Sequence, residues 1–195
     1  LVFSALPGQA LAETNLSHTY PKIANFYVAS PLTDSNIAKL AKWDVVVINL
    51  DNQIAFADKI RLLRVLNPDI KILVYVASQE FPIFSYRDWN PDPNGMWARL
   101  LRGITPEMWL TDNAGNHATF WADNWMLNVT NYPSSGQRWN EYLAEFVNRE
   151  LLSSGLYDGI FFDNTWASVS WVKGGIMDAN RDGVNDAREA LDRAW

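Results

Sequence analysis

The stretch YDGIFFDN, residues 157–164, decides the fold expected for this chain and the place where its chemistry lies. Its apolar run, bounded by polar residues on both sides, predicts a short buried β-strand that ends on the carboxylate of Asp163. In a parallel (βα) barrel, a polar residue at the last position of a strand faces the open mouth where ligands bind. Asp163 is therefore the first functional candidate. The alternative is that Asp163 and Asn164 only bond their own backbone to start a turn.

Apolar runs that alternate with helical segments precede this stretch. Strands are expected at residues 23–29, 44–50 and 70–77, and helices at residues 33–42 and 54–66. A fourth strand is expected at residues 125–130, and a helix at residues 137–153 leads into the strand of residues 157–164, the fifth. Strands and helices alternating at such short intervals predict parallel βα units.

A long excursion separates the third and fourth expected strands. Residues 78–124 hold four prolines and four tryptophans and show no regular period. A loop of that length inside a compact domain usually serves function.

The fold class expected from this order is α/β. We expect a (βα)8 TIM barrel, represented here by about its first five βα units. An eight-stranded barrel needs about 250 residues, and the chain stops at Trp195 inside an expected helix, so we expect a fragment truncated at both ends. Residues 13–195 would then be the N-terminal part of one catalytic domain. The alternative is a complete, open, doubly wound sheet of five strands.

The first twelve residues, LVFSALPGQALA, have the composition of the second half of a secretory signal peptide that is cut after Ala12. This pattern predicts a secreted protein, extracellular or periplasmic.

The composition excludes several classes of partner. The chain has 195 residues, of which 48% are hydrophobic and 19% charged, which suits a packed globular core and is too polar for a membrane bundle. The net charge is −6 and no Lys/Arg cluster occurs, so binding to nucleic acid is not expected. Cysteine is absent, so no disulfide contributes. The oligomeric state stays open.

Residues 178–189, DANRDGVNDARE, have the spacing of an EF-hand-like calcium loop. Gly183 stands at the sixth position, where the backbone of such a loop turns sharply. The expected Ca²⁺ ligands are the side chains at positions one, three, five, nine and twelve and one main-chain carbonyl at seven: Asp178, Asn180, Asp182, Asp186, Glu189 and Val184. A structural ion here would pin a loop over the active face. The alternative is a solvated acidic turn.

Four motifs in the second half of the chain together resemble a known group. The segments LNVT, RWNEYLAEFV, YDGIFFDN and DANRDGVND are similar to those of secreted (βα)8 barrels of the glycoside-hydrolase-like families, related to the α-galactosidase and endo-α-polygalactosaminidase groups. The resemblance covers residues 20–195. It implies a TIM barrel that acts on the glycosidic bonds of a carbohydrate substrate, with Asp163 as a catalytic carboxylate.

Glycoside cleavage needs two carboxyl groups, one protonated and one ionised. Asp163 is the candidate for the ionised group, as nucleophile or base. Glu80, after the third strand, is the candidate for the acid, although a strand beyond Trp195 is an alternative source. Asp51, after the second strand, lies on the same face and is a second candidate for the acid. It is otherwise expected to bind substrate or to cap the following helix.

The chain has ten tryptophans, several of which lie between the expected elements. Such rings either pin long loops to the core or stack on the apolar faces of sugars. The remaining candidates for substrate binding are Trp121, Trp125, Asn128, Asn164 and Trp166.

Two rival functions are weighed against a glycosidase. One is a carbohydrate-binding barrel without catalysis, in which Asp163 only accepts hydrogen bonds from hydroxyl groups. The other is a metal-dependent hydrolase, which is disfavoured because the two histidines, His18 and His117, do not follow strands. Motifs for nucleotide binding and for a serine hydrolase are absent from the sequence.

Overall fold

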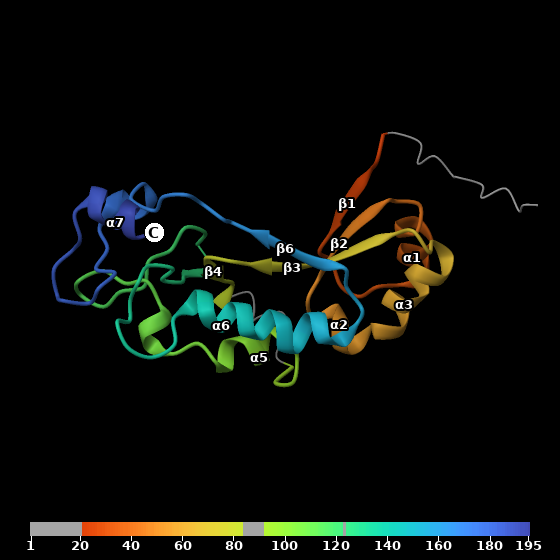
Figure 1. Cartoon of the computed structure of the whole chain (residues 1–195), viewed down its shortest axis with the longest axis horizontal. Coiled ribbons are helices and arrows are strands. Elements are labelled where there is room, and N and C mark those ends of the chain that lie inside the picture. The colour runs from red at the N-terminus through yellow and green to blue at the C-terminus, as the bar shows by residue number, and fades with distance from the viewer. Residues whose placement is uncertain (1–20, 84–91, 123) are drawn as a thin grey trace, which may run out of the picture.

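The central feature of the computed structural model, which describes residues 21–83, 92–122 and 124–195, is a parallel sheet (Figure 1). The expected signal segment, residues 1–12, lies outside the described residues. The sheet has the order β1-β2-β3-β6, and its strands are β1 (Ala24–Tyr27), β2 (Val45–Asn49), β3 (Lys71–Ala77) and β6 (Gly159–Asp163). The protein is therefore a mixed α/β protein, as the alternating pattern predicted.

Short helices connect the first three strands. Helix α1 (Asp34–Leu40) begins after Thr33, whose hydroxyl oxygen accepts the Asn36 backbone N–H at 3.2 Å. The single helix expected at residues 54–66 is divided into α2 (Asn52–Ala55) and α3 (Ala57–Leu66), because the backbone leaves the helical region at Phe56. Helices α1 and α3 pack against each other.

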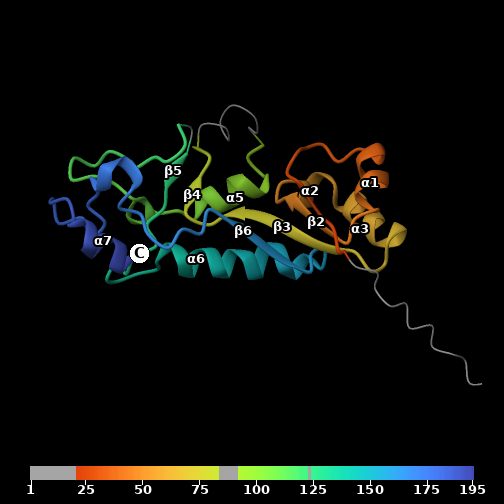
Figure 2. The ribbon, with the colours of Figure 1, turned by 90° about the horizontal axis from the view of Figure 1, so that it is seen from above.

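The two faces of the sheet differ in how far they are buried. One face is wholly buried in the main core by Val46, Ile48, Ile72, Val74 and Val76. This burial explains why these strands read as almost continuous apolar runs. Figure 2 shows α6 (Trp139–Phe146) running along β3 and β6, and its apolar residues belong to the same core.

The opposite face of the sheet carries an aromatic cluster. The ring of Phe26 meets Tyr75 and Phe161 edge-on, with centroids 5.6 and 5.4 Å apart, and 53% of Phe26 is exposed. Tyr75 is paired with Phe161 in the β3–β6 register, and Ala77 with Asp163.

The fourth parallel strand expected at residues 125–130 is wrong. Strand β5 (Trp125–Met126) instead pairs antiparallel with β4 (Glu80–Phe81) in a separate two-stranded sheet, and β3 pairs directly with β6. The backbone N–H of Met126 bonds to Ala118 O and that of Leu127 to Gln79 O, both at 2.9 Å. These partners belong to the long excursion, so the segment completes that excursion rather than the main sheet.

The excursion and the C-terminal residues form a second lobe. The excursion contains α5 (Met96–Arg102) and a 3-10 helix, Pro106–Met108. After α6 come a π-helical turn, Val147–Leu151, and a 3-10 turn, Leu152–Ser154.

The C-terminal end holds a 3-10 turn, Val172–Gly175, and α7 (Arg188–Ala194). A small core that includes Met126, Val169 and Leu191 packs this lobe together. In the described part of the chain, none of the helices is both long and apolar enough to span a bilayer.

Candidate active site

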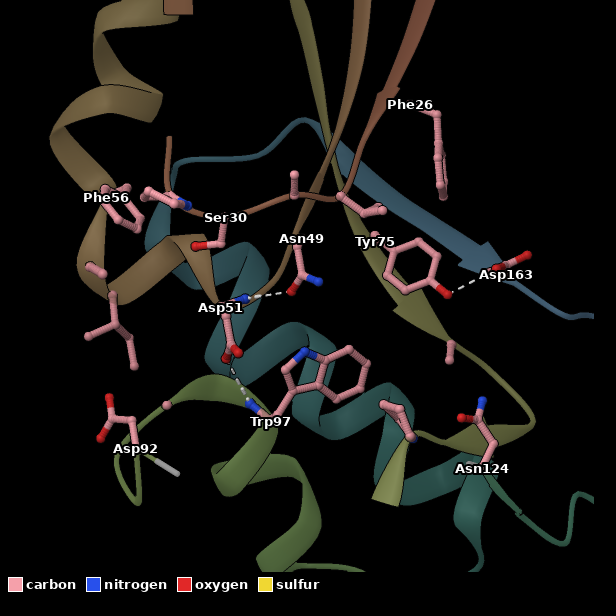
Figure 3. A pocket seen from close by; sticks show the side chains of 18 of the residues that line it. Phe26, Ser30, Asn49, Asp51, Phe56, Tyr75, Asp92, Trp97, Asn124 and Asp163 are labelled. Atoms are coloured by element: carbon pink, nitrogen blue, oxygen red, sulfur yellow. Dashed lines mark hydrogen bonds between the residues drawn. The ribbon is translucent and has the colours of Figure 1, made fainter. Parts of the chain in front are cut away.

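A cavity of about 810 Å³ opens where the parallel strands end (Figure 3). Its wall includes four carboxylates: Asp51, Glu80, Asp92 and Asp163. The carboxyl ends of parallel strands meet at one edge of a sheet, so residues that follow different strands converge there. The structure thus brings Asp163, Glu80 and Asp51, three residues predicted from sequence, into one cavity.

Asp163 is the last residue of β6 and contributes its carboxylate to the cavity wall. Its Oδ2 accepts the Tyr75 hydroxyl at 2.9 Å, and its Oδ1 accepts the Asn164 backbone N–H at 2.9 Å. The second bond is the turn-starting contact that was the alternative interpretation of this Asp-Asn pair. The same carboxylate starts a turn and lines the cavity, so the turn contact does not exclude a functional role for Asp163.

Tyr75 orients this carboxylate from the neighbouring strand, β3. Burial raises the pKa of the Tyr75 hydroxyl well above its usual value, and its hydrogen bond to Asp163 and the charges of Asp163 and Glu80 raise that pKa further. Tyr75 therefore stays protonated, and so remains a hydrogen-bond donor, through the neutral pH range.

Glu80 is the most buried of the four carboxylates, with 3% of the residue exposed. It belongs to β4, directly after the turn that follows β3. Its Oε1 accepts a hydrogen bond from the Asn164 side chain. The next residue, Phe81, packs edge-on against Trp97 with ring centroids 5.5 Å apart.

Asp51 does not cap the helix that follows it. It stands at the N-terminus of α2 without a side-chain capping bond, and its Oδ1 accepts the Trp97 backbone N–H at 3.2 Å (Figure 3). Trp97 lies in the first turn of α5, in the long excursion. The Asp51 N–H donates to Asn49 Oδ1 at 3.0 Å. Asp51 thus fixes the excursion to the mouth of the sheet.

Five residues predicted to bind substrate are not among those that line the cavity: Trp121, Trp125, Asn128, Asn164 and Trp166. Asn128 is 1% exposed, and its side chain is used internally: Nδ2 donates to Ala179 O at 2.7 Å, and Oδ1 accepts from Thr130. Trp125 is stacked on the His117 ring with centroids 3.7 Å apart. Trp121 and Trp166 both pack on Phe120 in the second lobe, with Trp121 52% exposed.

The cavity also contains residues that the sequence did not indicate: Phe26, Asn49, Phe56, Tyr75, Asp92, Trp97 and Asn124. Tyr75 carried a detectable signal, because residues 73, 75 and 77 alternate toward one face of β3, the face on which Asp163 of the neighbouring strand lies. Asn49 closes the second predicted strand in the same way that Asp163 closes β6. Trp97 and Asn124 belong to the excursion, whose path no local pattern reveals.

The predicted calcium loop folds around its own polar side chains. Asp178, 3% exposed, accepts the backbone N–H of Asp182 on Oδ1 at 3.1 Å and that of Gly183 on Oδ2 at 2.8 Å. Asp186 Oδ2 accepts the Ala179 N–H at 2.7 Å, and Gly183 has φ +88°. Over the described ranges, no three His, Cys, Asp or Glu side chains are grouped so as to hold a metal ion. The predicted ligand Glu189 lies in the first turn of α7.

Comparison with known proteins adds a family. The model of a family described as "Hypothetical glycosyl hydrolase family 15" matches residues 64–195, more than half of the chain. Among solved structures, the glycoside hydrolase domain of PelA variant E218A from Pseudomonas aeruginosa is 18% identical, with a TM-score of 0.41. The match covers 73% of this chain and 44% of that one, so the chain spans less than half the length of that structure. No curated protein matches the chain.

Proposed function

The chain belongs to hypothetical glycosyl hydrolase family 15, and from this membership we propose that it is a glycosidase that cleaves an extracellular oligo- or polysaccharide with two carboxyl groups. The observation that carries the proposal is the convergence of Asp163 and Glu80 on one cavity at the carboxyl ends of parallel strands. Two carboxyl groups in unlike environments are what glycoside hydrolysis requires.

The two carboxyl groups divide the chemistry by their surroundings. Asp163 accepts hydrogen bonds on both oxygens, from Tyr75 and Asn164, and the ionised form is the one that accepts both. It serves as nucleophile, or as the base that activates water. Glu80 is buried, and burial favours the protonated form of a carboxyl group. It donates the proton to the oxygen of the leaving group.

The remaining wall of the cavity suits a sugar. Asn49, Asp51 and Asn124 offer hydrogen-bonding groups to hydroxyls, while Trp97 and Phe56 offer apolar ring surface. We assign to these two rings the stacking role that the sequence had given to Trp121, Trp125 and Trp166.

We place this site in a (βα)8 barrel, of which residues 13–195 form a part. The parallel order of four strands supports this placement, as does the polar residue at the end of β6. We further propose that residues 1–12 direct secretion.

We also propose that residues 178–189 bind Ca²⁺ as a structural ion. Oxygen-bearing side chains at the expected spacing around Gly183 support the choice of a hard cation, and Asp178, Asn180, Asp182, Asp186, Glu189 and the Val184 carbonyl would hold it.

A sugar-binding protein without catalysis is the second candidate. The observation that favours it is that both oxygens of Asp163 already accept hydrogen bonds within the chain. Such a protein would keep the cavity and its rings but would not need Glu80 as an acid.

Kinetics of single variants separate the two candidates. Turnover is measured on a panel of aryl glycosides and polysaccharides, and sugar binding by calorimetry. Asp163→Asn and Glu80→Gln should each lower kcat by roughly 1000-fold or more while binding persists. Asp58→Asn, at an exposed position on α3, is the matched control and should behave as the wild type. Unchanged turnover in Asp163→Asn would remove this residue from catalysis. Sugar binding without turnover in the wild type would establish the second candidate.

A further inference from the structure

One residue, Asn164, contacts both carboxyl groups of the proposed reaction. Its backbone N–H donates to Asp163 Oδ1 at 2.9 Å, and its side-chain Nδ2 donates to Glu80 Oε1. Glu80 and Asn164 are 84 residues apart in sequence: Glu80 lies in β4 of the two-stranded sheet, and Asn164 directly follows β6 of the main sheet. Asn164 is thus the direct hydrogen-bonded link between the nucleophile or base and the acid.

The backbone of Asn164 is in the left-handed region, with φ +56°. Few residues other than glycine adopt this conformation, and asparagine is among those that tolerate it best. The left-handed turn directly after β6 lets the backbone N–H point back to Asp163 while the amide reaches Glu80. A residue with a negative φ would send the side chain elsewhere.

The segment that carries Asn164 is also held in place from β3. Gln79 Nε2 donates to Trp166 O, and the Trp166 N–H donates to Gln79 Oε1, both at 3.1 Å. Gln79 is the immediate neighbour of Glu80, so the acid and the residues after β6 are fixed to each other twice.

The chemical consequence concerns the proton of the acid. An oxygen that accepts an amide N–H acts as the carbonyl-type oxygen of a protonated carboxyl group, and the proton then resides on the other oxygen. We propose that Asn164 is a positioning residue that holds Glu80 through Oε1, places the acid proton on Oε2, and fixes the spacing between Glu80 and Asp163. This inference deepens the proposed glycosidase function and rests on it for the role of the proton.

Several ionisable groups lie near Glu80 and Asp163, and their titration would also affect any measurement made as a function of pH. Tyr75 on β3 bonds Asp163 and lies near Glu80, while Asp51 and Asp92 line the same cavity. The test must therefore observe Glu80 itself as well as the rate.

The test compares Asn164→Gly with Asn164→Asp in the intact protein. Glycine accepts the left-handed backbone and keeps the N–H to Asp163, so only the amide is lost. Aspartate keeps the shape but replaces the donor with a charge. Lys173→Gly, a second left-handed site in the second lobe, is the matched control for the backbone change.

The first measurement is a ¹³C NMR titration of the Glu80 carboxyl carbon, assigned by the loss of its signal in Glu80→Gln. Loss of the amide donor should move the deprotonation of Glu80 to higher pH by roughly one unit in Asn164→Gly, and further in Asn164→Asp. Lys173→Gly should leave it in place. An unchanged Glu80 titration in both Asn164 variants would overturn the inference, whether or not the protein cleaves sugars.

The second measurement is the pH dependence of kcat. In Asn164→Gly the alkaline limb should move by the same interval as the Glu80 titration, and kcat should fall about 10- to 100-fold with little change in KM. A purely structural role would lower the melting temperature and leave the alkaline limb where it is, which would contradict the proposal. Absence of turnover in the wild type would refute the glycosidase function. The titration of Glu80 would still show whether the Asn164 amide bonds to the Glu80 carboxyl group.

Discussion

Tyr75 shows how a single side chain prepares the cavity. Its ring belongs to the aromatic cluster with Phe26 and Phe161, and its hydroxyl belongs to the carboxylate site through Asp163. One residue therefore joins the aromatic cluster on one face of the sheet to the carboxylates at the edge of the sheet. Removing the hydroxyl alone tests the polar half of this role.

Tyr75→Phe should lower kcat/KM by about 10- to 100-fold, because Asp163 loses a donor that fixes its orientation. The aromatic packing stays, so the melting temperature should change by only a few degrees. Since the pKa of Tyr75 is raised, its hydroxyl remains protonated through the neutral range, and the loss should be the same at every pH tested there. Steady-state kinetics and thermal melts measure both effects.

Tyr157→Phe is the matched control for that variant. Tyr157 precedes β6 at the end away from the cavity, and within the described residues its buried hydroxyl has no hydrogen-bond partner. Removing it should leave kcat/KM unchanged and keep or raise the stability. A loss of activity in Tyr157→Phe equal to that in Tyr75→Phe would show that the effect of the latter is not local.

The sequence indicated Asp163, Glu80 and Asp51 because each follows a strand, and strand ends are visible as the last residues of apolar runs. The structure brings these three together. Asn128 also follows an apolar run, but its side-chain amide is hydrogen-bonded to Ala179 and Thr130 within the chain. A polar residue at the end of a strand faces the cavity only if the strand pairs within the main sheet. The residues of the strand itself do not reveal which strand it pairs with.

At the scale of elements, the second lobe is where local pattern and tertiary structure disagree. Residues 125–130 are apolar enough for a strand of the main sheet, yet their backbone bonds go to Ala118, Gln79 and Met108. The strands and helices on either side of the excursion were predictable within a few residues because each one has a clear period and a clear end. The excursion is held by short contacts between segments that are distant in sequence. A periodic pattern of apolar residues does not predict such contacts.

The calcium loop supplies a prediction for this lobe. Chelator should lower the melting temperature and added Ca²⁺ should restore it, because the ion binds the folded loop and not the unfolded chain. Asp178→Ala should abolish the response to Ca²⁺. Differential scanning calorimetry with and without Ca²⁺ measures it, with Asp58→Asn as a control. A melting temperature that changes with neither chelator nor added Ca²⁺ would contradict the proposal that this loop binds Ca²⁺.

Asp112 supplies a pH dependence for the same lobe. Hydrogen bonds from the side chain and backbone of Asn116, assisted by Lys173, lower the pKa of Asp112 from 3.8 to about 2. The carboxylate is therefore stabilised in the folded state, and this contribution is present above about pH 4 and lost as the pH falls through about 2. Asp112→Asn should lower the melting temperature at neutral pH and weaken its fall between pH 4 and 2. Thermal melts between pH 4 and 2 measure this effect. An equal fall of the melting temperature in the wild type and in Asp112→Asn would contradict the prediction.

For the whole molecule, charge constrains what enters the cavity. The chain carries a net charge of −6, and the cavity wall holds four carboxylates but, among its described residues, no Lys, Arg or His. The field at the mouth is negative and acts over roughly a Debye length, about 8–10 Å at moderate salt.

Neutral glycans should therefore be better substrates than glycans that carry uronic acids. For matched oligosaccharides, kcat/KM should be at least about tenfold lower for the uronate at low ionic strength, and added salt should narrow the difference. Initial rates at low and high salt measure this. A preference for the uronate at low salt would show that a cation outside the described wall governs recognition.

The link between β3 and β6 has a consequence for how the protein reaches its native state. Strands β1, β2 and β3 come from one continuous stretch of chain, whereas β6 must find β3 across an interval of about eighty residues. Pairing over such a long interval is slow compared with the formation of neighbouring βα units. The Tyr75–Asp163 contact spans this junction, so we expect a refolding chain to form α1, α2 and α3 before the cavity is complete.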